Sequence, residues 1–248
     1  MTGTGKVLAS QEAADKDSGK QDPLFRSAAD DGLARLLQQR EATYDLLSRL
    51  YREKVDEALI SQMKSSRYPA NTGNADIDKG YQLIVTYLSN LWEDSLPELS
   101  VDYTRTFIGY GVDAYSAAYP FESVHTSQRR LMMQAARDEV LALYRAAGFN
   151  KSAGWAEAED HVSVELEFMA RLCERALAAW EKGEEAQAFE ALVVQHSFLA
   201  DHLLPWTPMM TIEMRRFSKT DFYQGLAWLT DGFLKADLEF LDDFLGEG

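Results

Sequence analysis

An acidic run beside a histidine is the segment of this sequence whose residue types could do chemistry. Between positions 156 and 172 the chain reads AEAEDHVSVELEFMARL, in which Asp160 and His161 precede an apolar stretch that contains Glu165. Side chains of these types can bind a metal, transfer protons, cap a helix or receive a cationic partner. The spacing of the residues around them decides which of these roles the sequence favours.

Helical periodicity places Glu165 on the apolar face of a helix that begins near His161. At about 100° per residue, His161 lies at the edge of that face, one turn before Glu165. A carboxylate that faces a core is costly unless it is hydrogen-bonded, paired or protonated. Glu165 is therefore expected either to bond within the core or to face a ligand groove, and Asp160 is expected to cap the helix.

Metal and nucleotide patterns are weak in this sequence. His161 and Glu165 have the spacing of two ligands on one face, but the HExxH motif and paired Glu-x-x-His motifs are absent. The segment GTGKV, residues 3–7, lacks the full phosphate-loop pattern. We predict no metal ligands and no catalytic residues. Two alternatives stay open: a metal- or nucleotide-dependent, GTPase-like helical hydrolase that uses Asp160 and His161, and a purely structural adaptor.

Apolar residues recur at helical spacing along most of the chain, and no alternating strand pattern is convincing. The sequence therefore predicts an all-α fold of about nine helices. The predicted helices cover 31–50, 55–66, 77–94, 98–108, 122–147, 160–181, 185–203, 207–217 and 220–245.

The order of polar and helical segments predicts the domain organisation. Residues 1–30 are small and polar, which predicts a disordered tail before a helical domain over 31–248. A long interruption near 148–157 predicts a hinge between a larger lobe, 31–148, and a smaller lobe, 158–248. Such a hinge is compatible with a monomer or with a domain-swapped dimer.

Composition restricts the partners and the compartment. The chain has 25 basic and 40 acidic residues, and the net charge of -15 would repel nucleic acid and attract a cationic partner. The single cysteine, Cys173, excludes an internal disulfide and a multi-cysteine metal site. With no membrane-length apolar run and no signal-peptide pattern, we expect a cytoplasmic protein.

The same acidic segment carries a family resemblance. Glu157, Asp160, His161 and Glu165, with the apolar residues that follow, resemble the E-P-x-D-H-x-x-x-E-L-x-F-M signature of the TorD/DmsD-like chaperones that mature molybdenum enzymes. Ala158 stands where the family usually has proline. Four more segments resemble family elements in the family's order, so that the resemblance covers roughly 35–245: YTRTFIG (103–109), YPFESVH (119–125), LYRAAGF (143–149) and FLADHLLPW (198–206). His125 replaces a more usual aromatic residue in the second of them.

The resemblance implies an all-α cytoplasmic chaperone that is not itself an enzyme. It implies binding of the twin-arginine leader, or of another segment, of the catalytic subunit of a molybdopterin-containing oxidoreductase while the cofactor is inserted. No cofactor of its own is implied beyond weak binding of guanine nucleotide. Within this interpretation, Asp160 and His161 would form a recognition edge with charge from Glu157, and a facing wall would complete the peptide site: Tyr103, Phe107, Pro120, Ser123, Val124 and Glu165.

Overall fold

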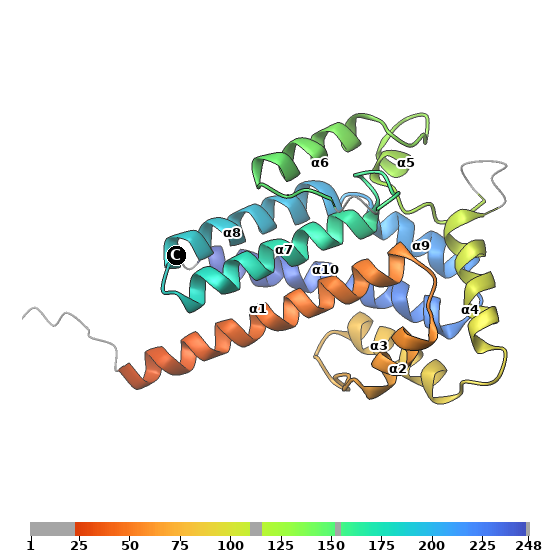
Figure 1. Cartoon of the computed structure of the whole chain (residues 1–248), viewed down its shortest axis with the longest axis horizontal. Coiled ribbons are helices and arrows are strands. Elements are labelled where there is room, and N and C mark those ends of the chain that lie inside the picture. The colour runs from red at the N-terminus through yellow and green to blue at the C-terminus, as the bar shows by residue number, and fades with distance from the viewer. Residues whose placement is uncertain (1–22, 110–115, 152–154, 247–248) are drawn as a thin grey trace, which may run out of the picture.

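Helices account for most of the chain in this computed structural model, which describes residues 23–109, 116–151 and 155–246. The all-α class predicted from periodicity is confirmed, with ten α-helices and two π-helical segments in the described ranges. An isolated bridge between Phe121 and His161 is the β-structure that these ranges contain. In chain order (Figure 1) the elements are α1 (Pro23–Arg52), α2 (Glu57–Ser65), α3 (Ala75–Ser89), α4 (Ser95–Tyr103), η1 (Thr104–Ile108), α5 (Glu122–Thr126), α6 (Ala135–Ala146), α7 (Val162–Glu181), α8 (Glu185–Phe198), η2 (Leu199–Leu203), α9 (Thr207–Phe217) and α10 (Asp221–Gly246).

The predicted single helix over 122–147 is wrong, because the chain leaves the helical conformation between α5 and α6. Arg130 and Met133 in this connection have positive φ angles of 49° and 57°, which an α-helix cannot contain. The Gln134 amide donates to the Ser123 hydroxyl at 3.0 Å and fixes the return of the loop. Apolar residues keep a helical spacing across this connection, which is why the sequence predicted one continuous helix.

The first helix begins at Pro23, earlier than the predicted start at Asp31. Proline suits the first position of a helix because it lacks the N–H that would be unpaired there. Residues 1–22 of the predicted tail lie outside the described residues. The predicted hinge near 148–157 and the division into two lobes stay predictions.

Helices that are distant in the sequence form the core. α1 packs along α7, α7 along α8, and α3 along α10 (Figure 1). One hydrophobic cluster includes Leu47 from α1, Ile84 from α3, Leu166 from α7 and Leu234 from α10. The segments before and after the predicted hinge therefore share a single core. Within the described ranges, every helix is too short or too polar to cross a bilayer.

A buried ion pair joins α1 to α10. Arg40 Nε lies 2.5 Å from one carboxylate oxygen of Asp237, and its Nη2 donates to the other at 2.9 Å. The Tyr44 hydroxyl also donates to this carboxylate, at 2.6 Å. Since all three side chains are buried, loss of Asp237 would leave a guanidinium without its counter-charge in the core.

Three glycines let α3 and α10 approach until their backbones touch. A Cβ at Gly80 would lie 2.6 Å from the Leu229 nitrogen, and one at Gly225 would lie 2.7 Å from the Gly80 oxygen. Further along, a Cβ at Gly232 would lie 2.8 Å from the nitrogen of Ile77. Any larger residue at these positions must push the two helices apart.

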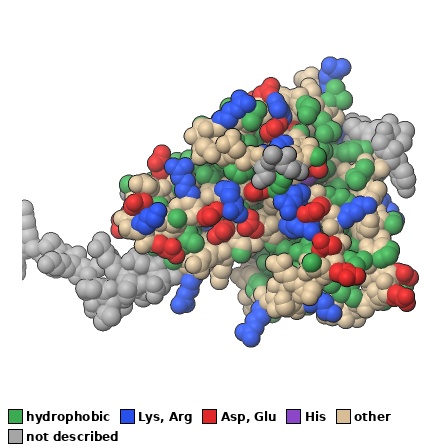
Figure 2. Space-filling model, viewed as in Figure 1, with side chains coloured by type: hydrophobic (Ala, Val, Ile, Leu, Met, Phe, Trp, Pro, Cys, Tyr) green, Lys and Arg blue, Asp and Glu red, His purple; other side chains and the backbone are tan. Residues whose placement is uncertain are grey.

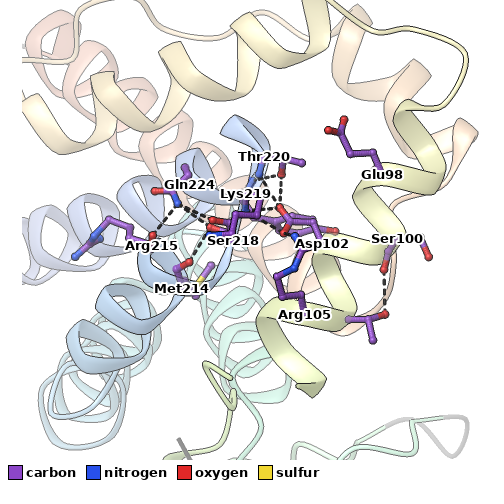
Figure 3. A network of polar contacts seen from close by, with 12 residues as sticks. Glu98, Ser100, Asp102, Arg105, Met214, Arg215, Ser218, Lys219, Thr220 and Gln224 are labelled. Carbon is purple, nitrogen blue, oxygen red and sulfur yellow. Dashed lines mark hydrogen bonds and ion pairs between the residues drawn. The ribbon is translucent and has the colours of Figure 1, made fainter. Parts of the chain in front are cut away.

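A carboxylate from α4 fixes the start of α10. Asp102, which is buried, accepts hydrogen bonds from the backbone amides of Lys219 and Thr220 at 3.0 and 2.8 Å (Figure 3). It also accepts from the Thr220 hydroxyl at 2.7 Å and from Arg105 at 2.8 Å. A negative charge at a helix N-terminus stabilises the unpaired amides there, so Asp102 ties α4 to α10.

We expect Gly80→Ala to lower the free energy of unfolding by about 1–3 kcal/mol, because the new methyl group meets the backbone of α10. Urea denaturation of the purified protein measures the change. Gly32→Ala in α1 is the matched control: a Cβ there meets nothing within 4 Å, and the exchange should raise stability by up to about 1 kcal/mol. Equal stability of Gly80→Ala and the parent would contradict the close contact of α3 with α10.

Candidate functional site

A short antiparallel bridge brings two of the family-like segments together. The Glu122 amide donates to the Asp160 carbonyl at 2.9 Å, and the Val162 amide donates to the Pro120 carbonyl at 2.9 Å. The Ser123 amide then donates to the Asp160 carboxylate at 3.1 Å. The segments YPFESVH and AEAEDH, far apart in the sequence, are therefore in direct backbone contact.

His161, and not Asp160, caps α7. The His161 Nδ1 atom accepts from the Ser163 amide at 3.1 Å and lies 2.7 Å from the Ser163 hydroxyl oxygen. The predicted capping role of Asp160 is wrong because the bridge turns its carboxylate toward the start of α5. Burial lowers the pKa of His161 to about 3, which keeps its ring neutral at neutral pH.

The predicted open edge at Asp160 and His161 is closed in the structure. Asp160 is 0% exposed and His161 is 4% exposed, which corrects the expectation that they line an open groove. The cause is the bridge, which lays the α5 segment over α7 and sets the Phe121 ring edge-on to the His161 ring at 4.8 Å. Pro120, Ser123 and Val124 of the same segment are also buried.

The other residues of the predicted site lie in different surroundings. Tyr103 and Phe107 belong to an aromatic cluster with Tyr51 and Tyr223, with ring centroids 5.0 to 6.1 Å apart. Burial, with a smaller effect of the Glu157 charge, raises the pKa of Tyr103 to about 12. Glu157 is half-buried. The other predicted peptide-binding residues are all buried, so Glu157 is the one of them that reaches solvent. Whether these residues bind a peptide stays a prediction.

Glu165 faces the core, as its position on the helical wheel predicted, and is fully buried. Neither of its carboxyl oxygens has a partner at hydrogen-bonding geometry. Burial, and then the nearby carboxylates of Glu122 and Asp160, raise its pKa well above the usual range, while the Trp206 indole acts in the opposite direction. A core-facing carboxylate can be hydrogen-bonded, paired or protonated, and these surroundings favour protonation.

Glu122 and His202 complete this buried cluster, and sequence reasoning gave neither of them a role. His202 Nδ1 lies 3.3 Å from a Glu122 carboxylate oxygen. This hydrogen bond, working against burial, raises the pKa of His202. Both residues stand inside family-like segments, YPFESVH and FLADHLLPW, so their position in those segments was the available signal.

An apolar groove of about 390 Å³ opens beside His202. Helices α6, α7 and α8 and the segment η2 form its walls, and the His202 ring stacks on Phe198 with centroids 5.2 Å apart. His202 therefore contacts Glu122 and also lines the groove. The lining includes Leu143 and Ala146 of α6, Ala147 directly after it, Phe168, Leu172 and Arg175 of α7, and Glu190, Val193, Val194, Ser197, Phe198, Asp201 and His202 of α8 and η2.

Two features bear on chemistry at this site: the possible metal ligands and the protonation of His161. Among the described residues, no three His, Cys, Asp or Glu side chains come together in a way that could hold a metal. His161 is buried and neutral, with a pKa near 3, which is too low for a general base at neutral pH. The hydrogen bonds of Asp160 hold α5 against the start of α7.

Comparisons with known proteins agree with the motifs. The family model described as the nitrate reductase delta subunit matches residues 73–211. The chain belongs to this family, the TorD family of chaperones. The family resemblance predicted from the motifs is therefore confirmed.

The TorD-family relatives match over most of their length. Chaperone protein TorD of Vibrio cholerae is 28% identical over 218 residues, which cover 86% of this chain and 96% of the relative. Chaperone protein TorD of Shewanella pealeana is 25% identical over 220 residues, which cover 84% and 92%. A crystal structure from Archaeoglobus fulgidus, of a protein assigned to redox enzyme maturation, covers 82% of this chain and 93% of that one, with 22% identity and a TM-score of 0.42.

In this TorD-family protein, Glu165→Gln should change how stability depends on pH. The folded state holds Glu165 protonated, whereas the unfolded chain ionises it near pH 4.5, so the parent loses stability as the pH rises above that value. Glutamine cannot ionise, so the variant does not lose stability in this way. The difference in free energy of unfolding, variant minus parent, should therefore rise by up to about 1.4 kcal/mol per pH unit. Urea denaturation at several pH values between about 4.5 and 8 measures the difference.

Glu181→Gln, at the exposed end of the same helix, is the control for this pH experiment. Its stability should follow the parent at every pH, because the Glu181 side chain is exposed to water before and after unfolding. If the pH profile of Glu165→Gln also ran parallel to the parent, the protonated state of Glu165 would be refuted.

Proposed function

We propose that this protein is a cytoplasmic chaperone that binds the leader, or another segment, of the catalytic subunit of a molybdopterin-containing oxidoreductase. It would hold that subunit while the cofactor is inserted, before export or assembly. Membership of the TorD family carries the proposal, since the curated relatives are named chaperone proteins. The chain would act as a binder, as monomer or domain-swapped dimer, with no cofactor of its own beyond weak binding of guanine nucleotide.

The charge of the chain supports a cationic partner. A net charge of -15 attracts arginine-containing segments over a distance limited by salt. On the face seen in Figure 2, however, basic and acidic side chains lie close together over α1 and α7, and Arg171 pairs with Asp45 at 2.8 Å there. Recognition would then depend on local groups of acids that have no basic neighbour, and not on one uniformly acidic face.

The closed state of the motif limits how a peptide could use it. Asp160 and His161 can touch a client only if the α5 segment moves away from α7, because the bridge covers both. Glu157 needs no such movement, since it is already partly exposed. A charged hydrogen bond between Glu157 and an arginine of the client would contribute about 1.5–3 kcal/mol.

Titration calorimetry with the twin-arginine leader peptide of a molybdoenzyme from the same organism tests the proposal. We expect micromolar affinity, about -8 kcal/mol, that weakens as salt screens the charges. A peptide in which the two arginines are replaced by glutamine should bind at least about tenfold more weakly, the loss of one charged hydrogen bond. Absence of binding both to this leader and to the cofactor-free enzyme subunit would refute the proposed function.

Glu157→Gln should weaken binding of the same leader by a few-fold to about tenfold if Glu157 supplies charge to the client. Glu174→Gln is the matched control, because Glu174 is exposed on α7 and pairs with Arg171 at 2.7 Å. Calorimetry at low salt compares the two variants. An unchanged affinity in Glu157→Gln would remove this residue from the site and leave the rest of the proposal standing.

A further inference from the structure

The groove beside His202 has the form of a docking site. Its floor is apolar, with Phe168, Leu172 and Phe198 in the lining. On its rim, Leu143 of α6 is 39% exposed and Val193 of α8 is 41% exposed. Large apolar side chains that remain in water around an apolar cavity are characteristic of binding surfaces.

Two hydrogen bonds to Glu159 fix the position of α6, which forms one side of the groove. The Tyr144 hydroxyl donates to the Glu159 carbonyl at 3.0 Å, and Arg137 donates to the Glu159 carboxylate at 2.6 Å. Val140 and Tyr144 bury one face of α6, while Leu143 projects on the groove side. In Figure 1, α6 accordingly lies over α7 and α8 as a separate upper layer.

Charge is distributed unevenly along the groove. Arg175 and Glu190 lie toward the turn that joins α7 to α8, where a positive charge accompanies the negative one. At the opposite end, Asp201 lines the groove beside His202. The hydrogen bond with Glu122, and then the charges of Glu139 and Asp201, raise the pKa of His202 against the effect of burial, so negative charge prevails near this end.

We propose that the groove binds a client segment in which one or two cationic residues adjoin an apolar run. The apolar run would lie against α7 and α8, and the cation would lie at the η2 end beside Asp201 and Glu139. This inference rests on the proposed function and gives it a location away from the closed Asp160 and His161 pair. It also fixes the direction of the segment, because a cation at the other end would meet Arg175.

A fluorescent label in the groove tests the location directly. The native thiol, Cys173, is buried, and burial raises its pKa to about 12, so an introduced cysteine can be labelled selectively. Ser197→Cys places an environment-sensitive dye on the groove wall, and Ser61→Cys on α2 places the same dye on an exposed site elsewhere. The full chain carries either label.

The probe is a synthetic peptide with two arginines followed by an apolar run of leucine and alanine. It should shift the emission of the Ser197→Cys conjugate in a saturable manner and leave the Ser61→Cys conjugate unchanged. A peptide with glutamates in place of the arginines should bind at least about tenfold more weakly, as expected when a charged contact is lost.

Charge variants test the direction. Asp201→Asn combined with Glu139→Gln should weaken binding of the arginine peptide about tenfold. The affinity for an uncharged peptide with the same apolar run should not change. Glu57→Gln, an exposed acid on α2, is the matched control and should change neither affinity. Circular dichroism of each variant confirms that the fold is retained.

The outcomes separate the two proposals. Suppose that the leader binds in calorimetry, but the emission of the Ser197→Cys conjugate does not change and the double variant binds as tightly as the parent. The groove is then refuted as the binding site, and the proposed function stands. If the arginine peptide shifts the groove label but no leader or enzyme subunit binds, the groove holds and the proposed function fails. If no peptide or client binds at all, both are overturned.

Discussion

The backbone bridge between Phe121 and His161 is the contact on which the candidate site depends. Two amides, those of Glu122 and Val162, each donate to a carbonyl of the other segment. Through this bridge the chain brings α5 over the start of α7, buries Asp160, and places Glu122 near Glu165. The same contact sets the Ser123 amide on the Asp160 carboxylate, and both Asp160 and His161 are buried there.

The buried carboxyl groups behind the bridge are electrostatically unfavourable to one another. Glu122, Asp160 and Glu165 are all buried, and like charges so close in a dry environment cannot all ionise. Protonation of Glu165 and the hydrogen bond from His202 reduce the cost. The carboxyl cluster is therefore compatible with burial because one of its members is kept uncharged.

The rest of the fold is a rigid base for this region. Arg40 and Asp237 join α1 to α10 through a buried ion pair, and Gly80 lets α3 touch α10 at the backbone. Asp102 fixes the start of α10. Helix α6 is tied at Glu159 by Arg137 and Tyr144, and its Val140 and Tyr144 side chains pack in the same core. One face of α6 is therefore anchored in the core, while Leu143 of the same helix lines the open groove.

The sequence alone determined the all-α class, the positions of several helices and the family. The predicted helix 207–217 coincides with α9, and the predicted 160–181 differs from α7 by two residues at its start. These features depend on neighbours three and four positions apart, which a sequence displays directly. The ordered motifs identified the family for the same reason, because each is a local string.

Only the tertiary structure decided which of the motif residues reach solvent. Asp160 meets the Ser123 amide across 37 positions of sequence, and this contact moved the capping role to His161 and closed the predicted edge. The helix predicted over 122–147 failed similarly, because its interruption is fixed by a bond that returns from Gln134 to Ser123. Burial and capping at these positions depend on contacts between separate segments, and helical spacing along one segment contains no information about them.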